Sequence, residues 1–239
     1  MKTLSKELYE KLHNQNLCPL DIIIDSNLFY KEIKKYQQKF KKWGDLHWEF
    51  PRYALPIVNQ TGSLEDSEDA SCWPLDRWNF CLKYPEYKYQ IPNEKSIEVW
   101  EDFYRTQIKL DETFVLEPNF KIKTDAYYMK CLEPLHVFDN FLYRSIIFKW
   151  DYSGHFKKHV DTFHNTGWLR LWGTLNSDSM ILRYKKGDKM VEENNIESGR
   201  IYLHDSIIEH EALAFRDDVY QFFIALDIDS YDLIEKLKL

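Results

Sequence analysis

Two metal-capable side chains stand two positions apart in the chain, at His159 and Asp161. On a β-strand, residues i and i+2 point to the same face, roughly 6–7 Å apart along the backbone. An imidazole and a carboxylate placed in this way can bind one metal ion. A second histidine from a remote strand would complete a set of two histidines and one carboxylate, which leaves coordination positions open on Fe(II).

The second histidine has two candidates, His204 and His210. His210 is preferred because it opens a new strand after a turn. It also lies 51 residues beyond His159, an interval that accommodates the intervening strands of a jelly roll. His204 stands at the end of the preceding strand. Its alternative roles are a neighbour of the metal ligands or a purely structural residue. Each histidine taken alone is more simply a core or surface residue, so the prediction depends on the group.

The elements that must position these residues are short strands, which begin after residue 140. Runs rich in Ile, Leu, Tyr, Phe and Trp alternate there with Gly, Asn or Asp. Short strands at intervals of roughly 8–12 residues are typical of a β-barrel or jelly roll. The predicted strands are Phe141–Trp150, Phe156–Asp161, Trp168–Leu175, Met180–Lys185, Arg200–His204, Glu209–Phe215 and Val219–Asp227.

The first 139 residues predict a different, mainly helical region. Within this region, helices are expected over 4–14, 27–43, 95–108 and 126–139, an extended segment over 51–58, and a polar and acidic loop or lid over 60–74. After the last predicted strand, a closing helix is expected over 230–238. No Gly/Ser linker separates the two regions. We therefore expect one domain over 1–239, with 1–139 as helical support and lid region and 140–229 as the jelly-roll core.

Several short segments between Tyr143 and Asp227 carry a resemblance to a known family. They are Arg144-Ser145, Gly154, His159-x-Asp161, Leu169-Arg170-Leu171, Gly199–Tyr202, Asp205–Glu211 and Phe222–Asp227. This region resembles the catalytic core of the iron(II)/2-oxoglutarate-dependent oxygenases, and most of all their aspartyl/asparaginyl β-hydroxylase-like branch, including small stand-alone members of marine bacteria and phages. Arg52–Asn59 resembles an N-terminal element of those stand-alone members.

The resemblance implies an α+β fold: a double-stranded β-helix (a cupin-like jelly roll) with a mostly helical N-terminal region. It implies Fe(II) held by His159, Asp161 and His210, with 2-oxoglutarate and O2 as cosubstrates. The activity implied is a hydroxylase that converts 2-oxoglutarate to succinate and CO2. Two positions depart from the larger β-hydroxylases: Asp161 stands where they have glycine, and Tyr220 where they have the arginine that grips 2-oxoglutarate.

The distal carboxylate of 2-oxoglutarate needs a cation, because an unpaired charge inside a barrel is costly. A guanidinium suits this role, since it donates two parallel hydrogen bonds. Arg170 is the first candidate because it stands between Leu169 and Leu171 in a predicted strand. Alternation then places Arg170 on the opposite face from the two leucines, where a polar lumen would lie.

Other residues are further candidates for binding the cosubstrate. Arg144 is second because it begins a strand and aligns with an arginine of the family. Arg183 and Arg216 follow, and Ser145 or Tyr220 would donate an additional hydrogen bond. The alternative for Arg170 is a structural ion pair with a nearby carboxylate.

The composition narrows the partners. The 32 Lys and Arg residues are outnumbered by 39 Asp and Glu residues, a net charge of −7 that disfavours nucleic-acid binding. No apolar run is long enough for a membrane span. The four cysteines form no Cys-x-x-Cys pair, so a reducing cytoplasm is expected. A small molecule or a peptide is therefore the expected class of substrate. The competing functions are a non-catalytic jelly-roll binding protein and a cupin-type metalloenzyme that does not use 2-oxoglutarate.

Overall fold

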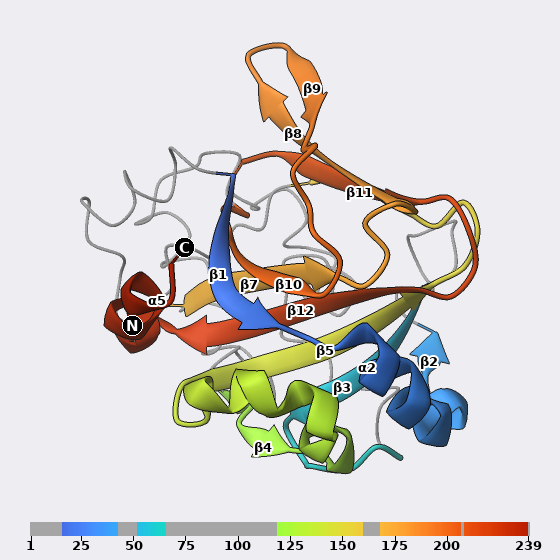
Figure 1. The fold of residues 1–239 in the computed structure, drawn as a ribbon, viewed down its shortest axis with the longest axis vertical. Coiled ribbons are helices and arrows are strands. Elements are labelled where there is room, and N and C mark those ends of the chain that lie inside the picture. The colour runs from blue at the N-terminus through green and yellow to red at the C-terminus, as the bar shows by residue number, and fades with distance from the viewer. Residues whose placement is uncertain (1–15, 43–51, 66–118, 160–167, 207, 239) are drawn as a thin grey trace, which may run out of the picture.

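The computed structural model describes residues 16–42, 52–65, 119–159, 168–206 and 208–238. These residues form two β-sheets that face each other, with helical segments outside the larger sheet (Figure 1). The larger sheet has the order β1-β10-β7-β12-β5-β3-β2, and β4 pairs with β3. The smaller sheet has the order β6-β11-β8-β9.

The strands of the larger sheet are β1 (Leu17–Ile23), β2 (Lys41–Lys42), β3 (Arg52–Asn59), β4 (Ile122–Lys123), β5 (Leu142–Trp150), β7 (Trp168–Thr174), β10 (Arg200–His204) and β12 (Val219–Asp227). The strands of the smaller sheet are β6 (His155–His159), β8 (Met180–Lys186), β9 (Lys189–Glu192) and β11 (His210–Ala214). Every pairing between these strands is antiparallel.

The chain from β5 to β12 winds back and forth between the two sheets. Strands β5, β7, β10 and β12 lie in the larger sheet, whereas β6, β8, β9 and β11 lie in the smaller one. The first and last of these strands, β5 and β12, pair with each other along most of their length. This is a double-stranded β-helix, so the predicted jelly roll is confirmed.

Alternation along the strands of the larger sheet creates two apolar faces. The inner face, which we call the lumen face, meets the smaller sheet in one buried cluster that includes Ile146, Trp150 and Leu182. The outer face belongs to a second cluster that includes Leu171 and Phe222. A side chain's position on its strand therefore decides whether it lies between the two sheets or outside them.

Helical segments cover the outer face. They are α2 (Ser26–Glu32), the 3-10 helices η1 (Ile33–Lys39), η4 (Asp125–Tyr128), η5 (Lys130–Phe138) and η7 (Ile228–Ser230), and the C-terminal α5 (Tyr231–Lys236). Asp25 caps α2 by accepting a hydrogen bond from the backbone N–H of Leu28 at 2.9 Å. Phe29, Ile33 and Leu132 then pack into the outer cluster against the sheet.

The predicted elements agree with the observed ones after residue 140, where all seven predicted strands exist. The extended segment over 51–58 is β3, and the closing helix is α5. The predicted helix over 27–43 is α2 followed by η1, and the one over 126–139 consists of 3-10 turns. The prediction missed β1, β4 and β9 altogether, and the end of the helix predicted over 27–43 was wrong because Lys41 and Lys42 form β2, which pairs with β3. The helices expected over 4–14 and 95–108, and most of the loop over 60–74, lie outside the described residues.

Within the described part of the chain, no helix is long and apolar enough to cross a membrane.

Candidate metal centre and lumen

His159 and His210 face each other across two paired strands. His159 is the last residue of β6 and His210 the first of β11, and the two are direct partners in the antiparallel register. Their ring centroids are 4.2 Å apart. The pairing of β6 with β11 contains a register shift next to this point. Because of this shift, His159 and Phe156 lie on the same side of the strand although they are three residues apart. Their ring centroids are 3.7 Å apart.

The hydrogen bonds of the two histidines fix the tautomer of each ring. Nδ1 of His159 lies 2.7 Å from the carbonyl oxygen of Lys157, and Nδ1 of His210 lies 2.8 Å from that of Ile208. A carbonyl only accepts, so Nδ1 of each ring carries a proton, and in the neutral imidazole that binds a metal the lone pair then lies on Nε2. A metal-binding histidine typically donates its other ring N–H to a backbone carbonyl in this way.

This donor set fits a transition metal such as Fe(II), for which imidazole nitrogens are suitable ligands. The third expected ligand, Asp161, lies outside the described residues. Among the residues that the structure describes, no three His, Cys, Asp or Glu side chains are grouped so as to hold a metal ion. The structure thus brings together the two histidines of the predicted set.

His204 lies beside this pair and has a different environment. Its ring centroid is 4.7 Å from that of His210, edge to face. Nδ1 of His204 lies 2.6 Å from the hydroxyl of Tyr184, and both side chains are buried. His204 is therefore a buried neighbour of His210 whose Nδ1 faces a hydroxyl, whereas Nδ1 of His159 and Nδ1 of His210 each face a backbone carbonyl.

Arg144 and Arg170 both lie on the lumen face. Leu169 and Leu171 pack in the outer cluster, so Arg170 between them points inward. The guanidinium carbons of Arg170 and Arg144 lie 4.7 and 5.2 Å from the ring centroid of Phe223, which packs against the cluster between the sheets. Both arginines are buried. The strands β7 and β5 thus present two guanidinium groups to one aromatic ring of β12.

Ser145 and Tyr220 lie on the outer face instead. Ser145 pairs with Ile224, a residue of the outer cluster, and its hydroxyl donates to the carbonyl of Tyr143 at 3.0 Å. Tyr220 also belongs to the outer cluster, and its hydroxyl accepts a hydrogen bond from Nε2 of Gln37 at 3.0 Å. The structure does not bring these two side chains together with Arg144 and Arg170.

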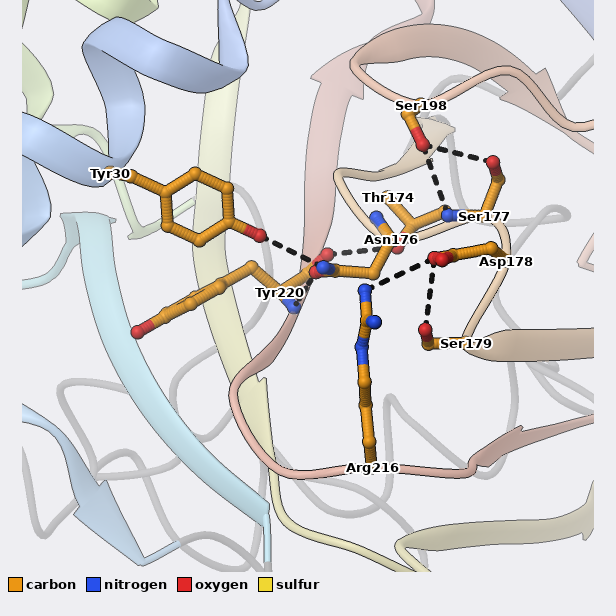
Figure 2. Close-up of polar contacts among 9 residues, drawn as sticks. All are labelled: Tyr30, Thr174, Asn176, Ser177, Asp178, Ser179, Ser198, Arg216 and Tyr220. Atoms are coloured by element: carbon orange, nitrogen blue, oxygen red, sulfur yellow. Dashed lines mark hydrogen bonds and ion pairs between the residues drawn. The ribbon is translucent and has the colours of Figure 1, made fainter.

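Figure 2 shows how Tyr220 is held in the outer layer. Its ring meets that of Tyr30 edge to face, with centroids 5.8 Å apart. Tyr30 in turn accepts a hydrogen bond from Nδ2 of Asn176, whose Oδ1 accepts from the backbone N–H of Tyr220. Burial raises the pKa of the Tyr220 hydroxyl above its usual value. Tyr220 therefore has a structural role between α2 and the sheet.

The two lower-ranked arginines lie away from the lumen. Arg183 of β8 donates a hydrogen bond to Glu211 of the neighbouring strand β11 at 3.5 Å. The residues next to them, such as Leu182 and Ala212, point into the lumen, so Arg183 and Glu211 point away from it. Arg216 is exposed in the turn before β12 and donates to Asp178 at 3.2 Å (Figure 2). Neither is placed to bind a molecule between the sheets.

The sequence analysis did not select Arg52 as a site residue, although it is a buried arginine close to the histidines. Its guanidinium carbon lies 3.9 Å from the ring centroid of Phe156, the ring that contacts His159. The sequence carried one of the signals that selected Arg144, an arginine at the start of a predicted extended segment.

Comparison with known proteins gives no family assignment. No protein-family model and no curated protein matches the chain. Among solved structures, it is similar to a Pseudomonas putida prolyl-4-hydroxylase (10% identity, 92% of this chain and 96% of the other, TM-score 0.42). It is also similar to a prolyl hydroxylase from Trichoplax adhaerens in complex with a hypoxia inducible factor peptide fragment (12% identity, 92% and 87%, TM-score 0.44). KdgF from Halomonas sp. is similar over 35% of this chain and 67% of its own, at 10% identity and a TM-score of 0.25. Because these TM-scores lie below 0.5, the likenesses do not identify the family.

Proposed function

We propose that the protein is a non-haem Fe(II)- and 2-oxoglutarate-dependent dioxygenase, related to the aspartyl/asparaginyl β-hydroxylase-like branch. One observation carries the proposal: His159 and His210 face each other on paired strands, and both present Nε2 with its lone pair. The substrate class is an amino acid, a peptide side chain or another small metabolite.

In this proposal His159, Asp161 and His210 hold the metal. Fe(II) in such a site supplies the chemistry that couples O2 to decarboxylation of 2-oxoglutarate and to hydroxylation of a C–H bond. The carbonyls of Lys157 and Ile208 orient the two imidazole rings, because each accepts the proton of Nδ1.

The cosubstrate is anchored by a guanidinium on the lumen face. Arg170 is the first choice, and Arg144 beside the same phenylalanine ring is the second. Both are buried, so a carboxylate that they bind is shielded from water and its interaction is strengthened by the low local dielectric.

The test measures metal binding and turnover in the full chain. We expect purified protein to bind one Fe(II), to change its absorption spectrum with 2-oxoglutarate under anaerobic conditions, and to form succinate in air. The variants His159→Ala and His210→Ala should lose metal and succinate formation together. His136→Ala is the matched control, since this histidine stacks on Tyr127 on the outer side of the fold.

Two outcomes would replace this proposal. Protein that binds no Fe(II), with histidine variants equal to the wild type, would be a non-catalytic jelly-roll binding protein. Protein that binds a metal through His159 and His210 but shows no spectral response to 2-oxoglutarate would be a cupin-type metalloenzyme.

A further inference from the structure

Arg52 places a guanidinium group between the two sheets, away from the Arg144 and Arg170 pair. It is the first residue of β3, is buried, and is the direct partner of Trp150 in β5. Its guanidinium carbon lies 5.1 Å from the ring of Phe148 in the larger sheet and 3.9 Å from that of Phe156 in the smaller sheet. The cation is thus enclosed by aromatic rings of both sheets.

This guanidinium is linked to the candidate metal centre through one aromatic ring. Phe156 contacts Arg52 on one side and His159 on the other, with a centroid distance of 3.7 Å to the histidine ring. By contrast, Arg144 stands six residues before Trp150 on the same strand, roughly 20 Å along the backbone at 3.3 Å per residue. Arg52 therefore marks a different part of the lumen from the arginine pair.

Trp150 adds a hydrogen-bond donor beside Arg52. Its side chain is fully buried in the cluster between the sheets, and its ring lies 5.7 Å from the guanidinium carbon. Within the described residues, the indole N–H of Trp150 has no hydrogen-bond acceptor. A buried donor of this kind normally has a partner, so this N–H points to an acceptor atom supplied by a bound molecule or by water.

Gln221 shows a similar feature on the adjacent strand. It pairs with Phe148 and alternates with Tyr220 and Phe222 of the outer cluster, so its amide lies on the lumen face. The side chain is buried, and its Oε1 has no hydrogen-bond donor among the residues the structure describes. Rotation of the amide by 180° would present its NH2 group instead.

We propose that Arg52 and Trp150 form a carboxylate subsite, which we call the Arg52 subsite, with Gln221 at its edge. A carboxylate accepts two parallel bonds from a guanidinium and has lone pairs left for the indole N–H. The flat aromatic walls suit a planar carboxylate on an apolar stem. This inference rests on the proposed function only in assuming that ligands bind in the lumen between the two sheets.

Two acids would carry this carboxylate: the substrate that is hydroxylated, or 2-oxoglutarate itself, in which case Arg52 takes the anchoring role proposed for Arg170. In either case the molecule extends from the Arg52 subsite toward His159. If the substrate is the source, then its class is narrowed to acids. If 2-oxoglutarate is the source, the subsite fills as 2-oxoglutarate binds. If the substrate is the source, the subsite stays empty until the substrate is added to protein saturated with 2-oxoglutarate.

The test follows the indole N–H of Trp150 by NMR in the full chain with 15N-labelled tryptophan, assigned through backbone-linked experiments. The probes are 2-oxoglutarate, succinate and L-aspartate, added to protein holding Zn(II), with neutral succinamide as the matched probe. We expect a saturable downfield shift of this resonance with a carboxylate and none with succinamide. A shift with 2-oxoglutarate alone identifies the cosubstrate as the source, and one that needs L-aspartate after 2-oxoglutarate saturation identifies the substrate.

The variants then test Arg52. Arg52→Gln should weaken binding of the active probe by about 10–100-fold, as loss of a charge-assisted hydrogen bond predicts, and Arg52→Lys should weaken it less. Arg216→Gln on the surface should bind as the wild type does. A Trp150 resonance that no carboxylate moves, or that succinamide moves equally, overturns the proposal, as does unchanged affinity in Arg52→Gln. No turnover is required, so failure of the proposed dioxygenase activity would be seen separately.

Discussion

Arg170 is buried on the lumen face. Its charge therefore interacts more strongly with a bound carboxylate than the charge of an exposed arginine would. We predict that Arg170→Gln raises the 2-oxoglutarate concentration needed for half-maximal succinate formation by about 10–100-fold, because a charge-assisted hydrogen bond contributes about 1.5–3 kcal/mol. The measurement is the dependence of the initial rate on 2-oxoglutarate concentration.

The controls for this prediction come from the other face of the same sheet. Ser145→Ala and Tyr220→Phe should leave the 2-oxoglutarate dependence unchanged, because both hydroxyls contact groups of the outer layer. If Arg170→Gln behaves as the wild type while Arg144→Gln shows the increase, then Arg144 is the anchor.

At the residue scale, alternation explains both what the sequence predicted and what it missed. Two flanking leucines were enough to place Arg170 on the lumen face, as the structure has it. The resemblance led instead to Tyr220, at the position where the larger β-hydroxylases have an arginine, but Tyr220 faces outward while the next residue, Gln221, faces inward. A shift of one residue along a strand exchanges its two faces, and a sequence interval does not determine register to that accuracy.

At the scale of elements, the apolar strands of the jelly roll were predictable, whereas β1 and β9 at sheet edges were not. β5, β7 and β12 are buried on both faces, so their sequences are mostly apolar, with a few buried polar residues such as Arg144 and Arg170. β1 contains Pro19 and Asp21, residues that are rare in strands. It pairs with β10 at the edge of the sheet, where a proline is tolerated.

Glu32 connects two helical segments that cover the outer face. Its carboxylate accepts hydrogen bonds from the backbone N–H groups of Cys131, at 3.0 Å, and Lys130, at 3.3 Å. Burial acts to raise the pKa of Glu32, but these hydrogen bonds outweigh it and hold the pKa below its usual 4.5. The carboxylate therefore ties the start of η5 to the end of α2.

The lowered pKa of Glu32 makes this tie dependent on pH. Because the folded state favours the charged form, the contribution is present above the unfolded pKa of about 4.5 and is lost as the pH falls through the lower folded pKa. We predict that Glu32→Gln lowers the free energy of unfolding by about 1 kcal/mol at pH 7, with a smaller difference at pH 3. Urea unfolding at both pH values measures this.

The control for Glu32 is Glu133→Gln, an exposed carboxylate on η5. This variant should unfold as the wild type does at pH 7. A loss of stability in Glu32→Gln that is the same at pH 3 and pH 7 would contradict the assignment to the charged carboxylate.

At the scale of the whole molecule, the N-terminal region and the jelly roll share one core. Leu20, Phe29 and Leu55 lie in the same buried cluster as Leu171 and Phe222. The strand β3 pairs with β5 through a long register, so it extends the larger sheet beyond the double-stranded β-helix. Its first residue, Arg52, also brings a charge from the N-terminal region into the lumen.

This shared core predicts a single cooperative unfolding transition. An N-terminal region folded independently would unfold at its own denaturant concentration, whereas one core and one sheet lose their packing together. We expect far-UV circular dichroism, which reports the backbone structure of both regions, and the fluorescence of the eight tryptophans, which are distributed over both regions, to give one and the same midpoint in urea. Two separated midpoints would show that the N-terminal region unfolds as a separate unit and would contradict the shared core.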